Sequence, residues 1–199
     1  MMNQVFILLD RSGSMASMWK EAIDGINSYV RKLENARVML AAFDTGDYKV
    51  VRNCRTEHWE HLSYNEIEPR GGTPLLDAAG RIMWSMHDSK ADRAILVVVT
   101  DGYENSSTKF KASEIKDMTK KLTSELNYDI VFLGANFDGI GEVASKNFGW
   151  SDSSRMVATS ARGFGSTMGS LSAKTSEYFA SGAKAEALYN QDELRQAKS

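Results

Sequence analysis

Short apolar runs recur along this chain at residues 5–9, 38–43, 94–99 and 130–133. Each run is rich in Val, Ile, Leu or Phe and shows no clean alternation with polar residues. Strands buried on both faces have this pattern, because helices cover both sides of the sheet that they form. The runs therefore predict a mostly parallel sheet enclosed by helices.

Helix-length segments, with apolar residues every three or four positions, separate most of these runs. The first covers residues 16–34. The second begins at Thr73 and Pro74, where proline is favourable because its missing N–H would have no partner there. A third begins near Ser113, and a shorter fourth follows Asn136. Alternating strands and helices are typical of an α/β fold.

The pattern changes in the middle and at the end of the chain. Turn residues precede a short apolar segment at 48–51, which we expect to be a short antiparallel edge strand. Residues 52–70 are charged and predict a long, partly exposed connection, and residues 155–159 predict a last strand. The expected fold class is α/β: a doubly wound, mostly parallel, six-stranded sheet with one short antiparallel edge strand and helices on both faces.

The C-terminal part is predicted to be helical. Apolar residues between 164 and 179 recur at helical spacing, whereas the chain beyond Gly182 is polar and Ala-rich. We expect that last part to be a frayed helix or a tail. Residues 1–160 are assigned to one domain, and residues 161–199 to a helical extension that packs on that domain or trails from it.

Polar side chains gather where three of the predicted elements begin or end. Asp10, Ser12 and Ser14 follow the first apolar run, Asp101 follows a central run, and Thr73 opens the second helix. Ligands of doubly wound sheets bind beyond the carboxyl ends of the strands, so these residues can share one site. Their hard oxygen atoms suit Mg²⁺, Ca²⁺ or Mn²⁺. Each residue alone would be an ordinary helix cap or turn residue; together they favour a metal site.

The Asp-x-Ser-x-Ser sequence that begins at Asp10, the threonine at position 73 and the Thr-Asp-Gly sequence around Asp101 resemble a von Willebrand factor type A (vWA) domain. They match the metal-ion-dependent adhesion site (MIDAS) of that family, and the resemblance spans residues 1 to about 160. It implies the Rossmann-like vWA fold, and a small stand-alone member of bacterial or phage type.

The resemblance also implies roles for these residues. The hydroxyls of Ser12, Ser14 and Thr73 would contact the metal, and Asp10 and Asp101 would act directly or through bound water. The implied cation is Mg²⁺, alternatively Mn²⁺ or Ca²⁺. A partner protein would complete the coordination with an Asp or Glu. By analogy alone, that partner could belong to an AAA-type ATPase or stress-response assembly.

The predicted function is therefore cation-dependent binding of a protein, without enzymatic activity. Two alternatives stay open: a metal-dependent hydrolase or phosphatase, and a structural subunit with an idle metal site. No general base or nucleophile accompanies the five residues, which argues against the enzyme.

Several nearby residues are weaker candidates. Trp59, Tyr64 and Met15 are considered for partner contact because aromatic residues and methionine are frequent in interfaces. Glu104 and Asn105 follow Asp101 closely and are interpreted equally well as support for the metal site or as a solvated loop.

Two further motifs are set aside. Cys54, His58 and His61 have neither a nearby fourth ligand nor a common zinc spacing, so an exposed polar loop is the better interpretation. The glycine-containing segment 134–141 departs from a dinucleotide-binding spacing. We expect it to be a strand-to-helix loop capped by Asn136 or Asp138.

Composition excludes some partners. The net charge is −2, and the Lys and Arg residues are scattered, so nothing here favours nucleic acid. The single cysteine, Cys54, cannot form an internal disulfide. The first apolar run lacks a basic flank and is too short for a signal peptide or a membrane span. We expect a cytoplasmic protein with no membrane partner.

Overall fold

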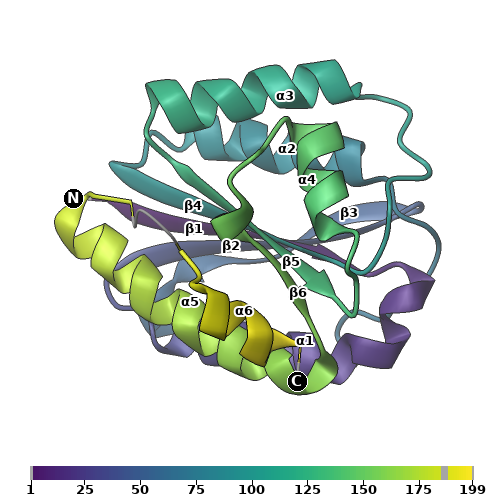
Figure 1. The fold of residues 1–199 in the computed structure, drawn as a ribbon, viewed down its shortest axis with the longest axis horizontal. Helices are drawn as coiled ribbons and strands as arrows, with labels where there is room; N and C mark the ends of the chain where they lie inside the picture. Colours follow the sequence, from purple (N-terminus) through teal and green to yellow (C-terminus); the bar gives the residue numbers. More distant parts are fainter. Residues whose placement is uncertain (1, 185–187, 199) are drawn as a thin grey trace.

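A six-stranded sheet forms the centre of the computed structural model, which describes residues 2–184 and 188–198 (Figure 1). The strand order is β3-β2-β1-β4-β5-β6, and every neighbouring pair is parallel except β2 and β3. This arrangement confirms the predicted fold class. The strands are β1 (Asn3–Asp10), β2 (Ala36–Asp44), β3 (Asp47–Arg55), β4 (Arg93–Thr100), β5 (Asp129–Ala135) and β6 (Met156–Thr159).

Helices cover both faces of the sheet (Figure 1). One face carries α2 (Leu75–Asp88), α3 (Ala112–Lys120) and α4 (Ile140–Phe148), and the other carries α1 (Trp19–Arg31), α5 (Ala161–Ser181) and α6 (Gln191–Ala197). Shorter helical segments are η1 (Gly13–Met18), η2 (Thr56–His58), the π-helical η3 (Lys121–Glu125) and η4 (Ser153–Arg155).

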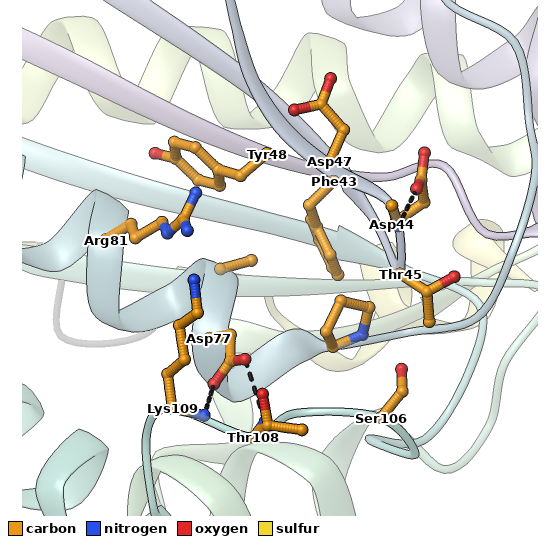
Figure 2. Close-up of a pocket in the computed structure, with 13 residues that line it drawn as sticks. Phe43, Asp44, Thr45, Asp47, Tyr48, Asp77, Arg81, Ser106, Thr108 and Lys109 are labelled. Carbon is orange, nitrogen blue, oxygen red and sulfur yellow. Dashed lines mark hydrogen bonds between the residues drawn. The ribbon is translucent and has the colours of Figure 1, made fainter.

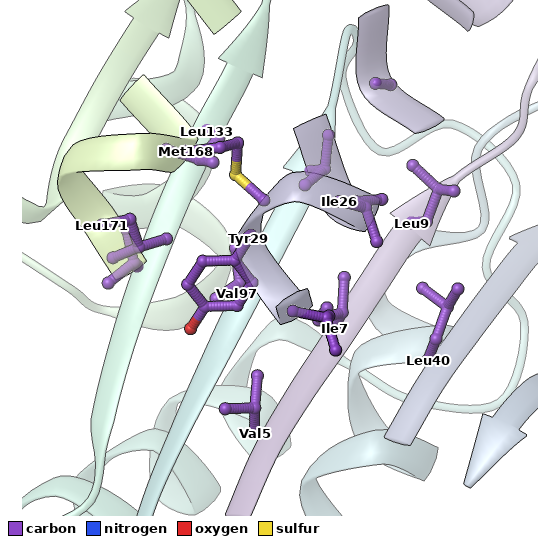
Figure 3. Packing of buried hydrophobic residues seen from close by; sticks show 14 of the residues in the cluster. Val5, Ile7, Leu9, Ile26, Tyr29, Leu40, Val97, Leu133, Met168 and Leu171 are labelled. Atoms are coloured by element: carbon purple, nitrogen blue, oxygen red, sulfur yellow. The ribbon is translucent and has the colours of Figure 1, made fainter. Parts of the chain in front are cut away.

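Strand β1 shows why its sequence does not alternate. Val5, Ile7 and Leu9 pack towards α1 and α5 (Figure 3), whereas Phe6 and Leu8 face the opposite helical layer. All five are fully buried. Burial of each such side chain stabilises the fold by roughly 1.5–3 kcal/mol. The continuous apolar run therefore results from helices on both sides of the sheet.

The edge strand and one helix start differ from the expectation. β3 contains nine residues and is not short; it pairs with β2 as far as Arg55, with an irregularity between Leu40 and Ala41. The expected cap of α4 is wrong, because Gly139 holds the N-cap position without a side-chain bond. Asp138 instead pairs with Lys198, at 2.7 Å between Oδ1 and Nζ.

Of the two expectations for the end of the chain, a tail is wrong for residues 188–198, because they include the helix α6 and pack against the sheet and α5. Tyr189 is buried, and the Ser160 N–H donates to the Ala197 carbonyl at 2.7 Å. Residues 185–187 and 199 of that prediction lie outside the described residues. The division at residue 160 between a domain and an extension stays a prediction.

The topology has a reversal of strand order beside β1. β1 lies between β2 and β4 in the centre of the sheet, and the helices that follow β1 and β4, α1 and α3, cover opposite faces. In open α/β sheets, ligands bind outside the carboxyl ends of the strands at such a reversal of strand order. Asp10 is the last residue of β1, and Thr100 is the last residue of β4.

Candidate metal and partner-binding site

Asp10 is held at the end of β1 by its neighbour strand. The parallel register pairs Leu9 with Val99, which brings Asp10 beside Thr100. The Thr100 hydroxyl donates to Asp10 Oδ2 at 2.6 Å, and the Ser12 N–H donates to Asp10 Oδ1 at 2.7 Å. Asp10 is 0% exposed. The carboxylate is therefore fixed in orientation and removed from bulk water.

Two serine hydroxyls and a second carboxylate lie next to it. Ser12 Oγ and Ser14 Oγ are 3.1 Å apart, and Ser14 Oγ donates to Asp101 Oδ1 at 2.8 Å. Ser12 Oγ is 3.5 Å from the same carboxylate oxygen. Ser12 is buried, Asp101 is half-buried and Ser14 is exposed. The cluster therefore opens to solvent on the side of Ser14.

Thr73 reaches the same rim from the segment that precedes α2. Its N–H donates to Asn105 Oδ1 at 2.9 Å, and the Asn105 N–H donates back to the Thr73 carbonyl at 3.1 Å. A Cβ built on Gly102 would lie 3.9 Å from Thr73 Oγ1. Thr73 therefore lies against the loop that carries Asp101, and the rim brings all five predicted residues together.

A tight turn makes this approach possible. Gly71 has a φ of +66°, a left-handed conformation that glycine adopts without strain. The Gly13 N–H donates to the Gly71 carbonyl at 3.0 Å. This bond ties the Asp-x-Ser-x-Ser loop to the segment that delivers Thr73.

Glu104 is a structural anchor of the rim. Its carboxylate accepts hydrogen bonds from the N–H groups of Leu76, Ser106 and Ser107 and from the Ser107 hydroxyl, at 2.7–2.9 Å. The start of α2 and the loop after Asp101 are therefore bound to one carboxylate. Of the two interpretations left open for Glu104 and Asn105, the contacts favour support of the rim.

The carboxylate of Asp77 makes a second link between α2 and the loop that follows Asp101. Asp77, in the first turn of α2, accepts hydrogen bonds from the N–H groups of Thr108, Lys109 and Phe110 at 2.8–3.0 Å. These bonds outweigh the effect of burial and lower the pKa of Asp77. Glu104 and Asp77 thus hold the α2 start and this loop in a fixed relation.

The two carboxylates of the rim have no counter-charge. Burial raises the pKa of Asp10 to about 6, although hydrogen bonds from Thr100 and Ser12 oppose this effect. Burial also raises the pKa of Asp101. Within the described part of the chain, no Lys, Arg or His forms an ion pair with either group. Two carboxylates beside three hydroxyls suit a hard divalent cation, which would supply the missing positive charge.

Metal sites of another kind find no support. Residues 2–184 and 188–198 contain no group of three or more His, Cys, Asp or Glu side chains arranged to hold a metal ion. Cys54, His58 and His61 therefore form no such group. Of the five residues proposed to hold the metal, Asp10 and Asp101 supply carboxylates and the other three supply hydroxyls.

The three weaker partner candidates differ in exposure. Met15 is 0% exposed within the core, so it is not available for contact with a partner. Trp59 packs against the core, and its Nε1 donates to Asn27 Oδ1 at 3.1 Å, which indicates a structural role. Tyr64 is 40% exposed. Of the three, Tyr64 retains the exposure that contact with a partner requires.

Sequence reasoning missed an aromatic pair at the rim. Tyr103 is 49% exposed and lies edge-on to Phe137, with ring centroids 4.9 Å apart. Its position two residues after Asp101 was the available signal. An exposed aromatic side chain beside a proposed ligand site is a plausible contact for a protein.

Fold and site together define a class of α/β protein with an oxygen-rich rim at the carboxyl end of its sheet. The von Willebrand factor type A domain family matches residues 5–104, and the chain belongs to this family. No curated protein matches the sequence.

Similar solved structures agree in fold. The vWF domain of the type V pili tip protein Mfa5 from Porphyromonas gingivalis has a TM-score of 0.70 at 10% identity, covering 92% of this chain and 96% of that one. The pilus adhesin SpaC from Lactobacillus rhamnosus GG has a TM-score of 0.69 at 12% identity, covering 88% and 30%. A von Willebrand factor type A structure from Catenulispora acidiphila has a TM-score of 0.64 at 18% identity, covering 87% and 42%.

The chain thus spans nearly the whole Mfa5 domain but less than half of the other two structures. In the described residues, no helix combines the length and apolar character required to cross a membrane.

Proposed function

We propose that this vWA domain binds a protein partner through a divalent cation held by Asp10, Ser12, Ser14, Thr73 and Asp101. The observation that carries the proposal is the pairing of two carboxylates, without a counter-ion among the described residues, with hydroxyls that converge on them. Burial of uncompensated charge is costly, and a bound cation offsets that cost. The rim faces solvent at Ser14, so a partner can reach it.

The chemistry of the donors indicates what the cation would do. Three of the five donors are neutral hydroxyls. Where Asp10 and Asp101 act through bound water, these hydroxyls are the direct donors, and the metal keeps its affinity for an anionic oxygen. Mg²⁺ prefers six oxygen ligands and retains water molecules that another oxygen can replace. An Asp or Glu of the partner is the natural replacement. Mg²⁺ is the proposed cation, with Mn²⁺ and Ca²⁺ as alternatives.

Related structures support a binding role. The names of two similar structures identify a pilus tip protein and a pilus adhesin. Their identities to this chain are 10% and 12%, so the likeness concerns the fold. Enzymatic activity is not proposed. A cytoplasmic location stays a prediction, and a membrane or nucleic acid is not proposed as partner.

Thermal unfolding with and without Mg²⁺ tests the metal. A ligand at one hundred times its dissociation constant stabilises the folded state by about 2.7 kcal/mol, so Mg²⁺ is expected to raise the melting temperature. Thr73→Val removes one hydroxyl and should reduce the rise. Thr159→Val is the matched control, because Thr159 is also buried at the carboxyl end of a strand, β6.

Two outcomes would contradict the proposal. One is an absence of any shift with Mg²⁺, Mn²⁺ and Ca²⁺, which would favour an idle site. The other is phosphatase or esterase turnover that Asp10→Ala abolishes, which would favour the enzyme. Binding of Glu-containing peptides that weakens strongly on chelation, and is weaker for the matching Gln peptides, would support capture of a carboxylate by the metal.

A further inference from the structure

A polar groove of about 370 Å³ lies on the α2 side of the rim (Figure 2). Its walls come from the turn between β2 and β3, the first turns of α2 and the loop at residues 106–109. Phe43, Pro74 and Ala78 supply its apolar surface. The volume falls within the range of roughly 300–1,000 Å³ that is usual for ligand sites.

The groove shares a wall with the proposed metal site. Pro74 lines the groove and directly follows Thr73. The Gly72 N–H donates to the Thr45 hydroxyl at 3.1 Å, and a Cβ on Gly72 would lie 3.5 Å from Ser106 Oγ. Thr45 and Ser106 both line the groove. One bound segment of chain could therefore reach both places.

The acidic side chains of the groove are already compensated. Asp44 Oδ2 lies 2.8 Å from Arg11 and 2.8 Å from Arg70. Asp77 accepts hydrogen bonds from three backbone N–H groups. Asp47 is 3.4 Å from Arg11. The groove accordingly shows little unmet demand for a cation, and no acidic cluster of metal-binding type occurs among the described residues.

The acidic side chains are compensated, whereas the basic side chains of the groove lack ion-pair partners among the described residues. Arg81 and Lys109 line the groove, are exposed, and form no ion pair with any described residue. Figure 2 shows their charged ends directed to the same side of the groove, near Tyr48. The Arg81 guanidinium lies 5.2 Å from the centre of the Tyr48 ring. Lys109 also acts at longer range on the Asp77 carboxylate, whose pKa it helps to lower. Two basic side chains without a direct ion pair among the described residues therefore converge here.

Two hydroxyl groups add hydrogen-bond donors. Tyr48 Oη and Ser106 Oγ are covered from solvent and have no hydrogen-bond partner in the described part of the chain. Burial raises the pKa of Tyr48 to about 12, so its hydroxyl keeps its proton at neutral pH. A buried hydroxyl without a partner costs free energy, and an arriving acceptor would recover it. The basic side chains and free hydroxyls of this groove therefore suit an anionic hydrogen-bond acceptor.

We propose that this groove binds a second carboxylate of the same partner segment, an Asp or Glu held by Arg81 and Lys109. The choice of occupant rests on the proposed function, because the first carboxylate of that segment would bind the metal. A guanidinium pairs with a carboxylate through two parallel hydrogen bonds, and the lysine adds a point charge. The partner motif is therefore diacidic.

The first experiment is independent of the metal. The probe is the peptide acetyl-Gly-Glu-Gly-amide, added to metal-free protein and followed by NMR at Tyr48 and at residues 45–48 and 106–109. A saturable shift of these signals is expected in the wild type, and its loss in Arg81→Gln/Lys109→Gln. Lys120→Gln/Lys146→Gln removes two exposed charges from α3 and α4 and should keep the shift. The absence of a shift, or equal shifts in both double variants, would overturn the groove site.

The second experiment adds Mg²⁺ and compares peptides with one Glu and with two Glu separated by about three to six residues, a span of roughly 10–20 Å in extended chain. The second Glu should increase the wild-type affinity by about three- to tenfold, as expected for two exposed ion pairs. Arg81→Gln/Lys109→Gln should remove that gain and leave the affinity of the one-Glu peptide unchanged.

The outcomes separate the two proposals. If one Glu binds with Mg²⁺ and the second adds nothing, the groove proposal fails and the metal proposal stands. If Mg²⁺ has no effect on either peptide while the metal-free NMR shift depends on Arg81 and Lys109, the metal proposal fails and the carboxylate site in the groove stands.

Discussion

Two buried aspartates end neighbouring strands at the same edge of the sheet, and their surroundings are opposite. Asp44 at the end of β2 contacts the guanidinium groups of Arg11 and Arg70. Asp10 at the end of β1 contacts a hydroxyl and an N–H, with no basic side chain among the described residues. Burial acts to raise both pKa values. Arg70 and Arg11, together with a hydrogen bond from the Gly46 N–H, reverse this effect for Asp44, whose pKa is lowered, whereas the pKa of Asp10 rises to about 6.

Arg11 makes the difference instructive. It directly follows Asp10 in the sequence, yet its guanidinium reaches Asp44 and Asp47. The fold thus uses an available cation to neutralise one aspartate and leaves the other without one among the described residues. In the proposed function a divalent ion takes that place. Asp44 is suited to a permanent structural ion pair, and Asp10 to an exchangeable ion.

Substituting each aspartate by asparagine tests this contrast with the largest expected effect. Asp44→Asn leaves the buried Arg11 with only its longer contact to Asp47 and should lower the free energy of unfolding by about 3 kcal/mol. Asp10→Asn in chelator should lower it by less than about 1 kcal/mol or raise it, because the change removes uncompensated buried charge. Its amide can accept from Ser12 N–H and donate to Thr100 Oγ1, which can itself donate to the Gly102 carbonyl 3.3 Å away. Urea unfolding measures both; equal losses would contradict the contrast.

The pH dependence sharpens the same comparison. The folded pKa of Asp44 is lower than its ordinary value of 3.8, so the folded state binds fewer protons than the unfolded state between the two values. The ion pair therefore contributes fully above about pH 4 and is lost as the pH falls through the folded pKa. The stability gap between wild type and Asp44→Asn should shrink there, by up to about 1.4 kcal/mol per pH unit.

Chemical unfolding at several pH values from about 2 to about 7 checks this expectation, because that range lies on both sides of the ordinary pKa of Asp. Asp117→Asn is the control, because Asp117 is exposed on α3 and forms no ion pair with a described residue. A gap that stays constant down to the acid limit would show that the Asp44 pair does not stabilise the fold.

A smaller effect concerns Glu104, which connects the rim to α2. Glu104→Gln keeps the shape but weakens the charge-assisted bonds to Leu76, Ser106 and Ser107, and should cost about 1 kcal/mol. The same loop positions Thr73, so the affinity for Mg²⁺ should also fall. The expected loss is about tenfold, the lower end of the range of about 10- to 100-fold for residues that orient a metal ligand. Isothermal calorimetry measures this against the exposed control Glu125→Gln, and identical Mg²⁺ affinities would refute the positioning role.

The fold class could be predicted because burial on both faces leaves a direct trace in the sequence. The run at residues 5–9 contains nothing but apolar side chains, since Phe6 and Leu8 meet one helical layer and Val5, Ile7 and Leu9 the other. The C-terminal segment leaves a weaker trace. Ala197 is buried, and its backbone carbonyl packs directly against Gly163. Such a backbone contact leaves no hydrophobic periodicity in the sequence.

That the five proposed site residues lie close together could be expected from the sequence for a related reason. Asp10 and Asp101 lie at the ends of apolar runs, and the carboxyl ends of parallel strands meet at one edge of the sheet. Met15 could not be placed correctly, because the short helix η1 turns its side chain into the core. The groove with Arg81 and Lys109 leaves no sequence signal, since these residues come from α2 and from a distant loop.

The sequence by itself determined the alternation of strands and helices, the vWA resemblance and the identity of the oxygen donors, because these depend on local order and spacing. Tertiary structure alone decided which charges are neutralised. Arg11 is adjacent to Asp10 in the chain but pairs with Asp44 in space, and Arg81 and Lys109 meet without an acidic partner among the described residues. Charge compensation depends on distances across the fold, which the order of residues does not encode directly.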